Sequence, residues 1–189
     1  FRPRYEGDRI VGRYNQGMLV LSYSRKEIDS GGILSGRNLE IAWLDDPIEL
    51  FFLHIEGSGL IRFEDGSSLQ VNYAAQNGRP YQSIGRLLID EGKLLKEGVS
   101  MESIKSFLKK NPYKMREVLN YNESYIFFRA VEAGPLGCLE VPLTPGRSIA
   151  TDHRCFPPAA LAFIIAERPL LDETGKLVKW KKFSRFVFN

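Results

Sequence analysis

An Asp-Gly pair between two alternating runs is the feature that most constrains how this chain can fold. Leu60–Phe63 and Ser68–Tyr73 both alternate apolar and polar residues, and Asp65-Gly66 lies between them. Asp and Gly tolerate the positive φ angles of a tight turn, so the pattern predicts an antiparallel hairpin. One face of that hairpin should carry the side chains of Ile61, Phe63, Leu69 and Val71.

Three helices are predicted after the hairpin. Pro80 suits the first position of one helix, and Ser100 and Asn111 can cap two more. Gly92 should follow the first of these helices, and Asn111-Pro112 should end the second. Apolar residues recur at helical spacing in all three, namely Ile84, Leu87 and Leu88, then Ile104, Phe107 and Leu108, then Met115, Val118 and Leu119.

Two helix signals precede the hairpin. Ser24–Ser30 predicts a short helix, because Ser24 can cap it, Glu27 follows three residues later, and Gly31-Gly32 can end it. Asp45-Asp46 before Pro47 indicates the start of a helix or turn. The run Ile48–Ile55 that follows is almost continuously apolar, which predicts that it is buried on both sides.

The remaining patterns are typical of strands. They fall at Ile10-Val11, Met18–Tyr23, Tyr125–Phe128, Leu139–Val141, Ser148–Ala150, Leu161–Ile165 and Phe183–Phe188. Strands thus flank a short helical segment, in a chain of 189 residues with 43% hydrophobic and 26% charged residues. The fold class predicted is α+β, mainly β, with the sheets closed as barrels.

Charge and cysteine content exclude several classes of function. The net charge is only +3, and the densest basic run, Lys179–Lys182, is more typical of a solvated strand end or turn than of a nucleic-acid patch. No nucleic-acid partner is expected, although a mildly basic face would suit an anionic polymer. Two histidines and two cysteines without ligand spacing predict neither a metal site nor a cofactor. Whether Cys138 and Cys155 form a disulfide is left open.

No membrane-spanning segment is predicted, because no apolar run reaches the ~18 residues that a spanning helix needs. The start at Phe1 also lacks the charged and apolar regions of a signal peptide. The chain begins and ends abruptly, so we expect that both ends are cut.

Ordered sequence blocks run through most of the chain. They are Leu44–Pro47, Phe51-Phe52, Glu56–Gly59, Tyr73–Gly78, Pro80-Tyr81, Ser83–Arg86, Met101, Asn122–Tyr125, Phe127-Phe128, Val141–Ser148, and then Asp152, Arg154 and Pro157. In this order and at these distances they resemble the membrane-bound lytic murein transglycosylase A family, from about Gly12 to Asn189.

The resemblance implies a fold, an activity and a location. Residues 1–140 would be the family's insert domain, β-barrel-like with a short helical segment, and residues 141–189 the first part of a double-psi-type catalytic barrel. The family cuts the MurNAc-GlcNAc β-1,4 bond of peptidoglycan without hydrolysis. The C6 hydroxyl of the substrate attacks its own anomeric carbon, so one Asp can serve as acid and then base. Peptidoglycan strands would be the partner. The location would be the periplasmic side of the outer membrane, with any membrane anchor outside this chain.

Departures from the family pattern limit the expected activity. The family usually has Gln at the positions of His54 and Glu56, and Gly at that of Ala159. Two of its three characteristic aspartates, including the catalytic one, fall beyond Asn189. We therefore expect no catalytic residue in this chain and no activity from it alone. Asp152 is a supporting candidate, with an equal case for a role as a turn cap.

Candidate glycan-binding residues combine aromatic faces with amide and hydroxyl groups. They are Glu56, Gly57, Ser58, Gly59, Tyr73, Gln76, Asn77, Tyr81, Ser83 and, from the resemblance, Arg154. Hairpin pairing should bring Gly57–Gly59 close to Tyr73. The competing interpretation is that these pieces are turns, with the tyrosines in the core, and that Glu56 faces solvent. His54, in an apolar run, is more typical of a satisfied core histidine than of a catalytic base.

Three functions remain open at this point. The chain is part of a lytic transglycosylase, or it is a non-catalytic glycan-binding module, or it docks other cell-wall enzymes. Release of anhydro-muropeptides separates the first from the others, and binding to glycan separates the second from the third.

Overall fold

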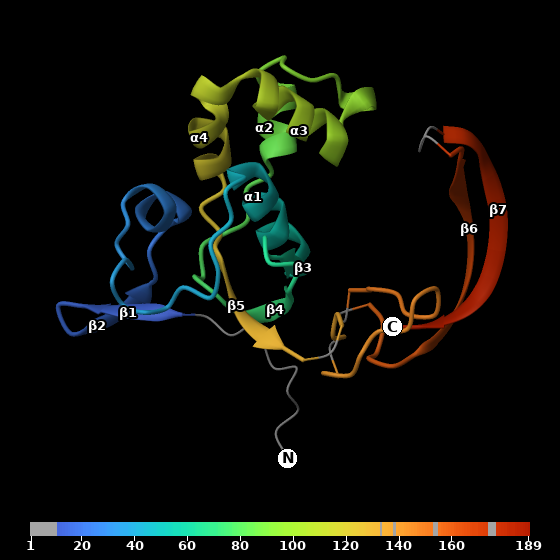
Figure 1. Ribbon diagram of the computed structural model, residues 1–189, viewed down its shortest axis with the longest axis horizontal. Helices are drawn as coiled ribbons and strands as arrows, with labels where there is room; N and C mark the ends of the chain where they lie inside the picture. The colour runs from blue at the N-terminus through green and yellow to red at the C-terminus, as the bar shows by residue number, and fades with distance from the viewer. Residues whose placement is uncertain (1–10, 133, 138, 153–154, 174–176) are drawn as a thin grey trace. The chain divides into compact units, whose positions relative to one another are not determined.

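The computed structural model describes residues 11–132, 134–137, 139–152, 155–173 and 177–189. The chain divides into two compact units, Phe1–Glu132 and Ala133–Asn189. Elements of the first unit are β1 (Gly12–Asn15), β2 (Met18–Leu21), η1 (Lys26–Ser30), α1 (Pro47–Glu56), β3 (Ser58–Arg62), β4 (Ser68–Gln76), α2 (Ile84–Asp90), η2 (Lys96–Gly98), α3 (Met101–Lys110), α4 (Pro112–Tyr121) and β5 (Ile126–Val131). The second unit contains β6 (Leu161–Leu171) and β7 (Leu177–Phe188) (Figure 1).

The predicted hairpin is confirmed as β3 and β4. Ser58 pairs with Asn72 and Ile61 with Leu69 in an antiparallel register. The turn is longer than two residues, because the backbone N–H of Phe63 donates to the carbonyl of Ser67. Gly66 has a φ of 84°, a conformation that glycine adopts at little cost.

β5 pairs antiparallel with β4 and completes a three-stranded sheet in the order β3-β4-β5. The other sheets are two-stranded, β1-β2 and β6-β7. Within the described residues no sheet closes on itself, so the barrel closure expected from the sequence is not borne out. The mixture of helices and strands agrees with the predicted α+β class.

Asp46 and Pro47 start helix α1, as their sequence predicts. The Asp46 carboxylate accepts hydrogen bonds from the backbone N–H groups of Ile48 (2.8 Å) and Glu49 (3.3 Å). Gly57, with a φ of 73°, ends the helix. The expected burial on both sides was wrong, because α1 is amphipathic and Ile55 is 38% exposed.

The three helices after the hairpin form as α2, α3 and α4, with one change of start. α2 begins at Ile84 with Ser83 as its cap, so the assignment of Pro80 to its first position was wrong. A helix begins where a side chain can accept one of its first free backbone N–H groups. Ser83 provides that acceptor, and it lies three residues after Pro80. Ser100 caps α3 in a reciprocal capping box with Ser103. Asn111 lies between α3 and α4, and its amide donates to Phe107 O of α3 instead of capping α4.

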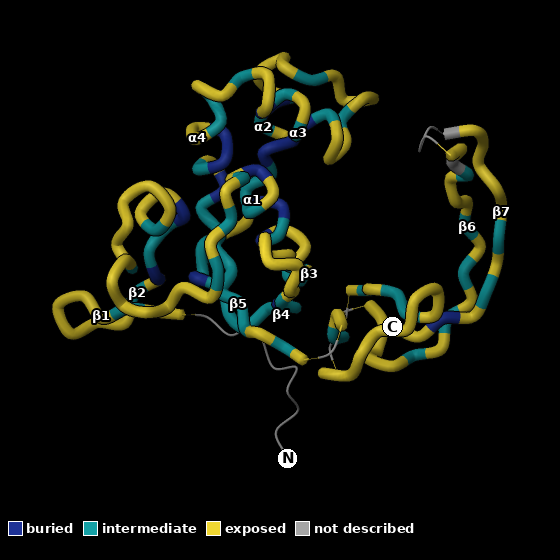
Figure 2. Tube along the Cα trace, in the orientation of Figure 1, coloured by how far each residue is buried: buried dark blue, intermediate teal, exposed yellow. Residues whose placement is uncertain are grey.

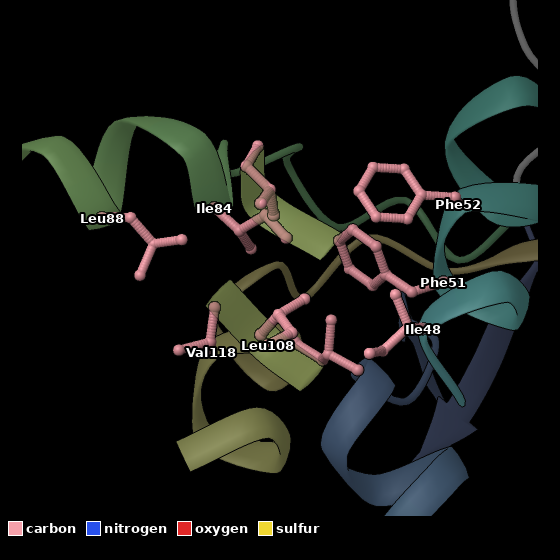
Figure 3. Packing of buried hydrophobic residues seen from close by; sticks show 9 residues of the cluster. Ile48, Phe51, Phe52, Ile84, Leu88, Leu108 and Val118 are labelled. Atoms are coloured by element: carbon pink, nitrogen blue, oxygen red, sulfur yellow. The ribbon is translucent and has the colours of Figure 1, made fainter. Parts of the chain in front are cut away.

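The core of the first unit lies where α1 meets α2, α3 and α4. Figure 3 shows Phe51 and Phe52 of α1 facing Ile84, Leu108 and their neighbours. The complete cluster is Ile48, Phe51, Phe52, Ile84, Leu88, Ile104, Leu108, Val118 and Leu119. The dark blue segments of Figure 2 gather along these helices.

The short helix before α1 is confirmed in position and differs in type. η1 is a π-helix, and a reciprocal pair of hydrogen bonds spans its start: Ser24 N donates to Glu27 Oε2, and Glu27 N donates to Ser24 Oγ. Gly31 ends it. The strand predicted from Met18 forms as β2 and pairs antiparallel with β1, which begins at Gly12; Ile10 of the other predicted strand lies outside the described residues.

The second unit is dominated by the long β6-β7 hairpin. Leu161 pairs with Phe188, and the ladder continues to Leu171 and Leu177. Strands predicted at Leu139–Val141 and Ser148–Ala150 are wrong. Leu139–Val141 is a turn between the bridged residues Leu136 and Pro142, and Ser148 makes one isolated bridge, with Phe188. Short apolar runs between Gly and Pro residues are too short to form a continuous hydrogen-bonded ladder with a neighbouring strand. Lys179–Lys182 lies within β7 rather than at its end.

None of the described helices combines the length and the apolar character needed to cross a membrane.

Candidate functional site

A pocket of about 290 Å³ lies in the first unit, beside the C-terminal turn of α1. Its walls come from four separate segments: the residue before η1, the end of α1, the turn before α2, and the connection from α4 into β5. The lining residues are Arg25, His54, Ile55, Tyr81, Asn122, Ser124 and Ile126.

Arg25 fastens the N-terminal segment to the connection before β5. Its side chain is buried, and its Nε and Nη2 donate to the carbonyls of Asn122 (3.1 Å) and Ser124 (2.7 Å). The guanidinium lies over the rings of Phe51 and Tyr125, at 4.8 and 5.3 Å from their centroids. The pocket therefore has a fixed positive charge in its wall.

Asp29 is the ionic partner of this guanidinium, at 3.5 Å from Nη1. Burial raises the pKa of Asp29, and the Arg25 charge opposes that rise. Burial also lowers the pKa of Arg25. Both shifts have the same cause, which is the removal of the pair from water.

His54 is a buried core histidine, as its apolar surroundings predict, with one of its two ring nitrogens hydrogen-bonded to protein. It is 4% exposed, its Nδ1 accepts the backbone N–H of Ile126 (3.1 Å), and its ring packs on those of Tyr125 and Phe128. Burial, and then the charge of Arg25, lower its pKa to about 3. His54 is therefore neutral at ordinary pH, and the bond at Nδ1 leaves its proton on Nε2.

Asn122 holds the segment that carries Tyr81. Its side-chain Oδ1 accepts the backbone N–H groups of Gln82 (3.1 Å) and Ser124 (3.2 Å). The residue itself is 1% exposed, whereas Tyr81 is 61% exposed. Tyr81 thus presents its ring at the rim of the pocket, on a backbone fixed by a buried amide.

Asn77 has a structural role and does not join the pocket. Its side chain is fully buried, and Nδ2 donates to the carbonyls of Tyr23 and Glu123 while Oδ1 accepts from the backbone of Arg79 and Tyr125. All four hydrogen-bonding positions of the amide are used by backbone. We therefore remove Asn77 from the candidate glycan contacts.

Most other candidates lie along the sheet and the ends of the helices. Ser58 pairs with Asn72, and a side chain at Gly57 would contact Tyr73 Cβ at 4.0 Å, so the predicted approach of these two segments occurs. Gln76 pairs with Ile126, which lines the pocket. Ser83 Oγ accepts the N–H of Arg86 as the cap of α2. Glu56 is the last residue of α1 and is exposed.

The second unit contains the remaining candidates. Asp152 is exposed, and its carbonyl accepts the N–H groups of Cys155 and Phe156 in a turn. Arg154 and Cys138 lie outside the described residues, and Cys155 is an exposed free thiol. Within the described part of the chain, no three His, Cys, Asp or Glu side chains gather as a metal site would require.

Sequence reasoning placed Tyr81 in the candidate set but missed its neighbours in the pocket. Arg25 gave no signal, because a basic residue near a short helix is usually solvated. Asn122 and Ser124 stood in a recognised block, and their polarity in a segment before an apolar strand was the available clue.

The sequence was compared with protein families and with curated proteins, and both comparisons found similar proteins. Residues 1–129 match the family described as the MltA specific insert domain. The membrane-bound lytic murein transglycosylase A of Escherichia coli (strain K12) is 38% identical over 156 residues, which are 81% of this chain and 42% of that protein. The chain thus spans less than half the length of this curated relative.

Solved structures of lytic murein transglycosylases are also similar to this chain. A membrane-bound lytic murein transglycosylase from Agrobacterium tumefaciens has a TM-score of 0.79 and 36% identity, over 97% of this chain and 50% of that one. E. coli MltA with bound chitohexaose has a TM-score of 0.75 and 32% identity, over 100% of this chain and 55% of that one.

Proposed function

The chain belongs to the membrane-bound lytic murein transglycosylase A family, and from this membership we propose that it holds a peptidoglycan strand for a lytic transglycosylase. The reaction proposed is non-hydrolytic cleavage of the MurNAc-GlcNAc β-1,4 bond, giving a 1,6-anhydro-MurNAc end. The observation that carries this proposal is the match of residues 1–129 to the MltA insert domain.

The first unit has the features of a binding region. Its pocket combines an exposed aromatic ring, buried polar groups and apolar walls, which is the usual composition of a sugar site. A volume of about 290 Å³ suits one sugar residue better than a longer stretch of strand. The bound chitohexaose named for E. coli MltA supports an N-acetylglucosamine-type ligand by similarity.

Among the described residues that line the pocket, none is a carboxylic acid. Asp29 has the raised pKa that an acid catalyst needs, but it is paired with Arg25 and does not line the pocket. We propose that binding is the role of this unit and that the single catalytic Asp is none of its residues. Asp152 and Arg154 of the second unit remain proposed supporting contacts.

The location proposed is the cell envelope, on the periplasmic side of the outer membrane. The relatives are named membrane-bound, which supports association with a membrane. Glycan strands are the proposed partner. A non-catalytic glycan-binding module is the second candidate, and the pocket lacking an acid favours it for the first unit by itself.

The test is digestion of purified sacculi by the 189-residue chain and by a form extended to the length of the E. coli relative. Products are identified by mass spectrometry. Anhydro-muropeptides from the extended form alone would support the proposal. Release by the shorter chain would move the acid into these residues, and absence of product from both would leave only the binding module.

A second experiment links the function to the pocket. Tyr81→Ala should weaken binding of GlcNAc-MurNAc oligomers about tenfold by calorimetry, because it removes an exposed stacking face without touching the core. Tyr113→Ala removes another exposed tyrosine ring, on α4, and is the matched control. Unchanged affinity of the Tyr81 variant would remove this pocket from the site.

A further inference from the structure

Two buried side chains of the pocket each keep one hydrogen-bond donor unused. His54 Nδ1 accepts the backbone N–H of Ile126, and no hydrogen bond within the described residues uses its Nε2. Asn122 Oδ1 accepts two backbone N–H groups, and its Nδ2 likewise has no hydrogen-bond partner within the described residues. A donor that the protein leaves unpaired at a pocket wall takes its partner from solvent or from a ligand, so this pair is available to a ligand with an acceptor oxygen.

Both donors belong to residues that line the pocket, and neither donor atom is completely sealed in protein. Arg13 Nε is the only side-chain nitrogen or oxygen of the described residues that is sealed without a partner, so His54 Nε2 and Asn122 Nδ2 each keep some accessible surface. Both residues line the pocket. Their orientation is fixed, because the acceptor of each ring or amide is held by a backbone N–H.

The other walls are apolar or aromatic. Ile55 and Ile126 line the same pocket as the two donor residues, and Tyr81 is an exposed residue of its lining. An acetamido group has a carbonyl oxygen that accepts, a methyl group that is apolar, and a pyranose ring attached beside them. The carbonyl oxygen would accept from the two donors, the methyl group would contact the isoleucines, and the pyranose ring would stack on Tyr81.

The charge of Arg25 adds a discrimination. A ligand ammonium in this pocket would lie near a buried guanidinium, where repulsion is only weakly screened. A neutral ligand with an acceptor oxygen suffers no such cost. The low pKa of His54 keeps a second positive charge out of the pocket and leaves its Nε2–H as a neutral donor.

We propose that this pocket is a subsite for the acetamido group of one N-acetylated sugar, with Asn122 Nδ2 and His54 Nε2 donating to its carbonyl oxygen. The inference rests on the proposed glycan binding and specifies the acetamido group as the part of the sugar that the pocket recognises. It predicts that the protein distinguishes N-acetylated from de-N-acetylated glycan.

The experiment uses three ligands of equal length, measured by calorimetry with the whole chain. These are the N-acetylglucosamine tetramer, the glucosamine tetramer, which carries ammonium groups, and cellotetraose, which carries neutral hydroxyls. We expect the first to bind at least about tenfold more tightly than either of the others. Cellotetraose separates loss of the acetamido group from repulsion of charge.

The variant Asn122→Asp keeps the shape and the oxygen that holds Gln82 and Ser124, and replaces the donor by an acceptor. It should lose about tenfold in affinity for the N-acetylated tetramer and gain affinity for the glucosamine tetramer. Tyr113→Ala should leave the order of the three ligands unchanged. In the unaltered protein, the ¹⁵N signal of His54 Nε2 should shift on adding the N-acetylated tetramer and stay in place with cellotetraose.

The outcomes separate this inference from the function on which it rests. Equal affinity for all three tetramers would overturn the acetamido subsite while keeping glycan binding. No binding of any tetramer would overturn both. If Asn122→Asp does not fold, the ligand series on the unaltered chain still decides.

Discussion

The two units of the chain are stabilised in different ways. In the first, nine buried hydrophobic residues from four helices form one cluster. In the second, Val187 is the buried hydrophobic residue among those described, and one face of β6-β7 exposes Leu161, Phe163, Ile165, Phe186 and Phe188. Figure 2 shows this difference as dark blue segments along the helices and a largely yellow and teal hairpin.

A rigid site is built where buried packing holds the element that carries it. α1 carries Phe51 and Phe52 into the core and His54 and Ile55 into the pocket, so the packing that stabilises the helix also positions the pocket wall. The β6-β7 hairpin relies on its ladder and on cross-strand pairs such as Phe163 with Phe186.

Truncating the core should give the largest effect. Leu88→Ala removes a fully buried side chain of α2, and we expect a loss of about 2–5 kcal/mol in the free energy of unfolding, measured by urea denaturation. Leu161→Ala, at an exposed position of β6, is the matched change in the second unit and should cost less than about 1 kcal/mol. Equal losses would abolish the contrast between the units.

Acid should destabilise the first unit through His54. Its folded-state pKa of about 3 lies below the ordinary 6.5, so the unfolded chain binds the proton more tightly. The stability that this difference provides is complete above pH 6.5 and is lost as the pH falls towards 3. The slope approaches about 1.4 kcal/mol per pH unit.

The comparison that isolates this slope is His54→Gln, which keeps an acceptor for Ile126 N–H and cannot titrate. Arg25, Tyr125 and Asp29, the ionisable groups packed around His54 and its partners, are present in both proteins and cancel in the difference. Parallel stability curves from pH 7 to 4 would show that His54 is not the cause.

Removing the cap of α3 should have a smaller effect. Ser100→Ala deletes the side chain that accepts Ser103 N–H, and should cost about 1 kcal/mol in thermal or chemical unfolding. Ser106→Ala, at an exposed site within the same helix, should be neutral or slightly stabilising. A loss at Ser106 as large as that at Ser100 would rule out capping as the reason.

The smallest effect is expected in the β6-β7 hairpin. Phe163→Ala breaks its ring contact with Phe186, at 4.9 Å between centroids, and should cost about 0.5–1 kcal/mol. Amide hydrogen exchange along β6 and β7 would report the change locally. A loss comparable to that of Leu88→Ala would mean that Phe163 is buried in solution.

Local chemistry predicted much of the fold. Asp46-Pro47, Ser100 and Asp65-Gly66 act within a few residues of themselves, and each formed the helix start or turn expected of it. Leu139–Val141 and Ser148–Ala150 failed because a strand requires a partner, and the partner is chosen by the whole chain.

The site was less predictable for the same reason. Asn77 looked like a sugar ligand by residue type, but four backbone groups from distant segments had already taken its amide. Arg25 entered the pocket through carbonyls 97 and 99 positions away in sequence. Such contacts leave no periodicity or spacing that a single sequence can reveal.

Those separations have a consequence for synthesis on the ribosome. Helices and the β3-β4 hairpin close over short stretches, whereas the Arg25 bonds require that Asn122 and Ser124 have already been made. A nascent chain can therefore form its local elements early, but Arg25 must wait for almost one hundred further residues before its partners emerge. The pocket is thus among the last parts of the first unit to be completed, and any pause in translation before residue 122 leaves it open.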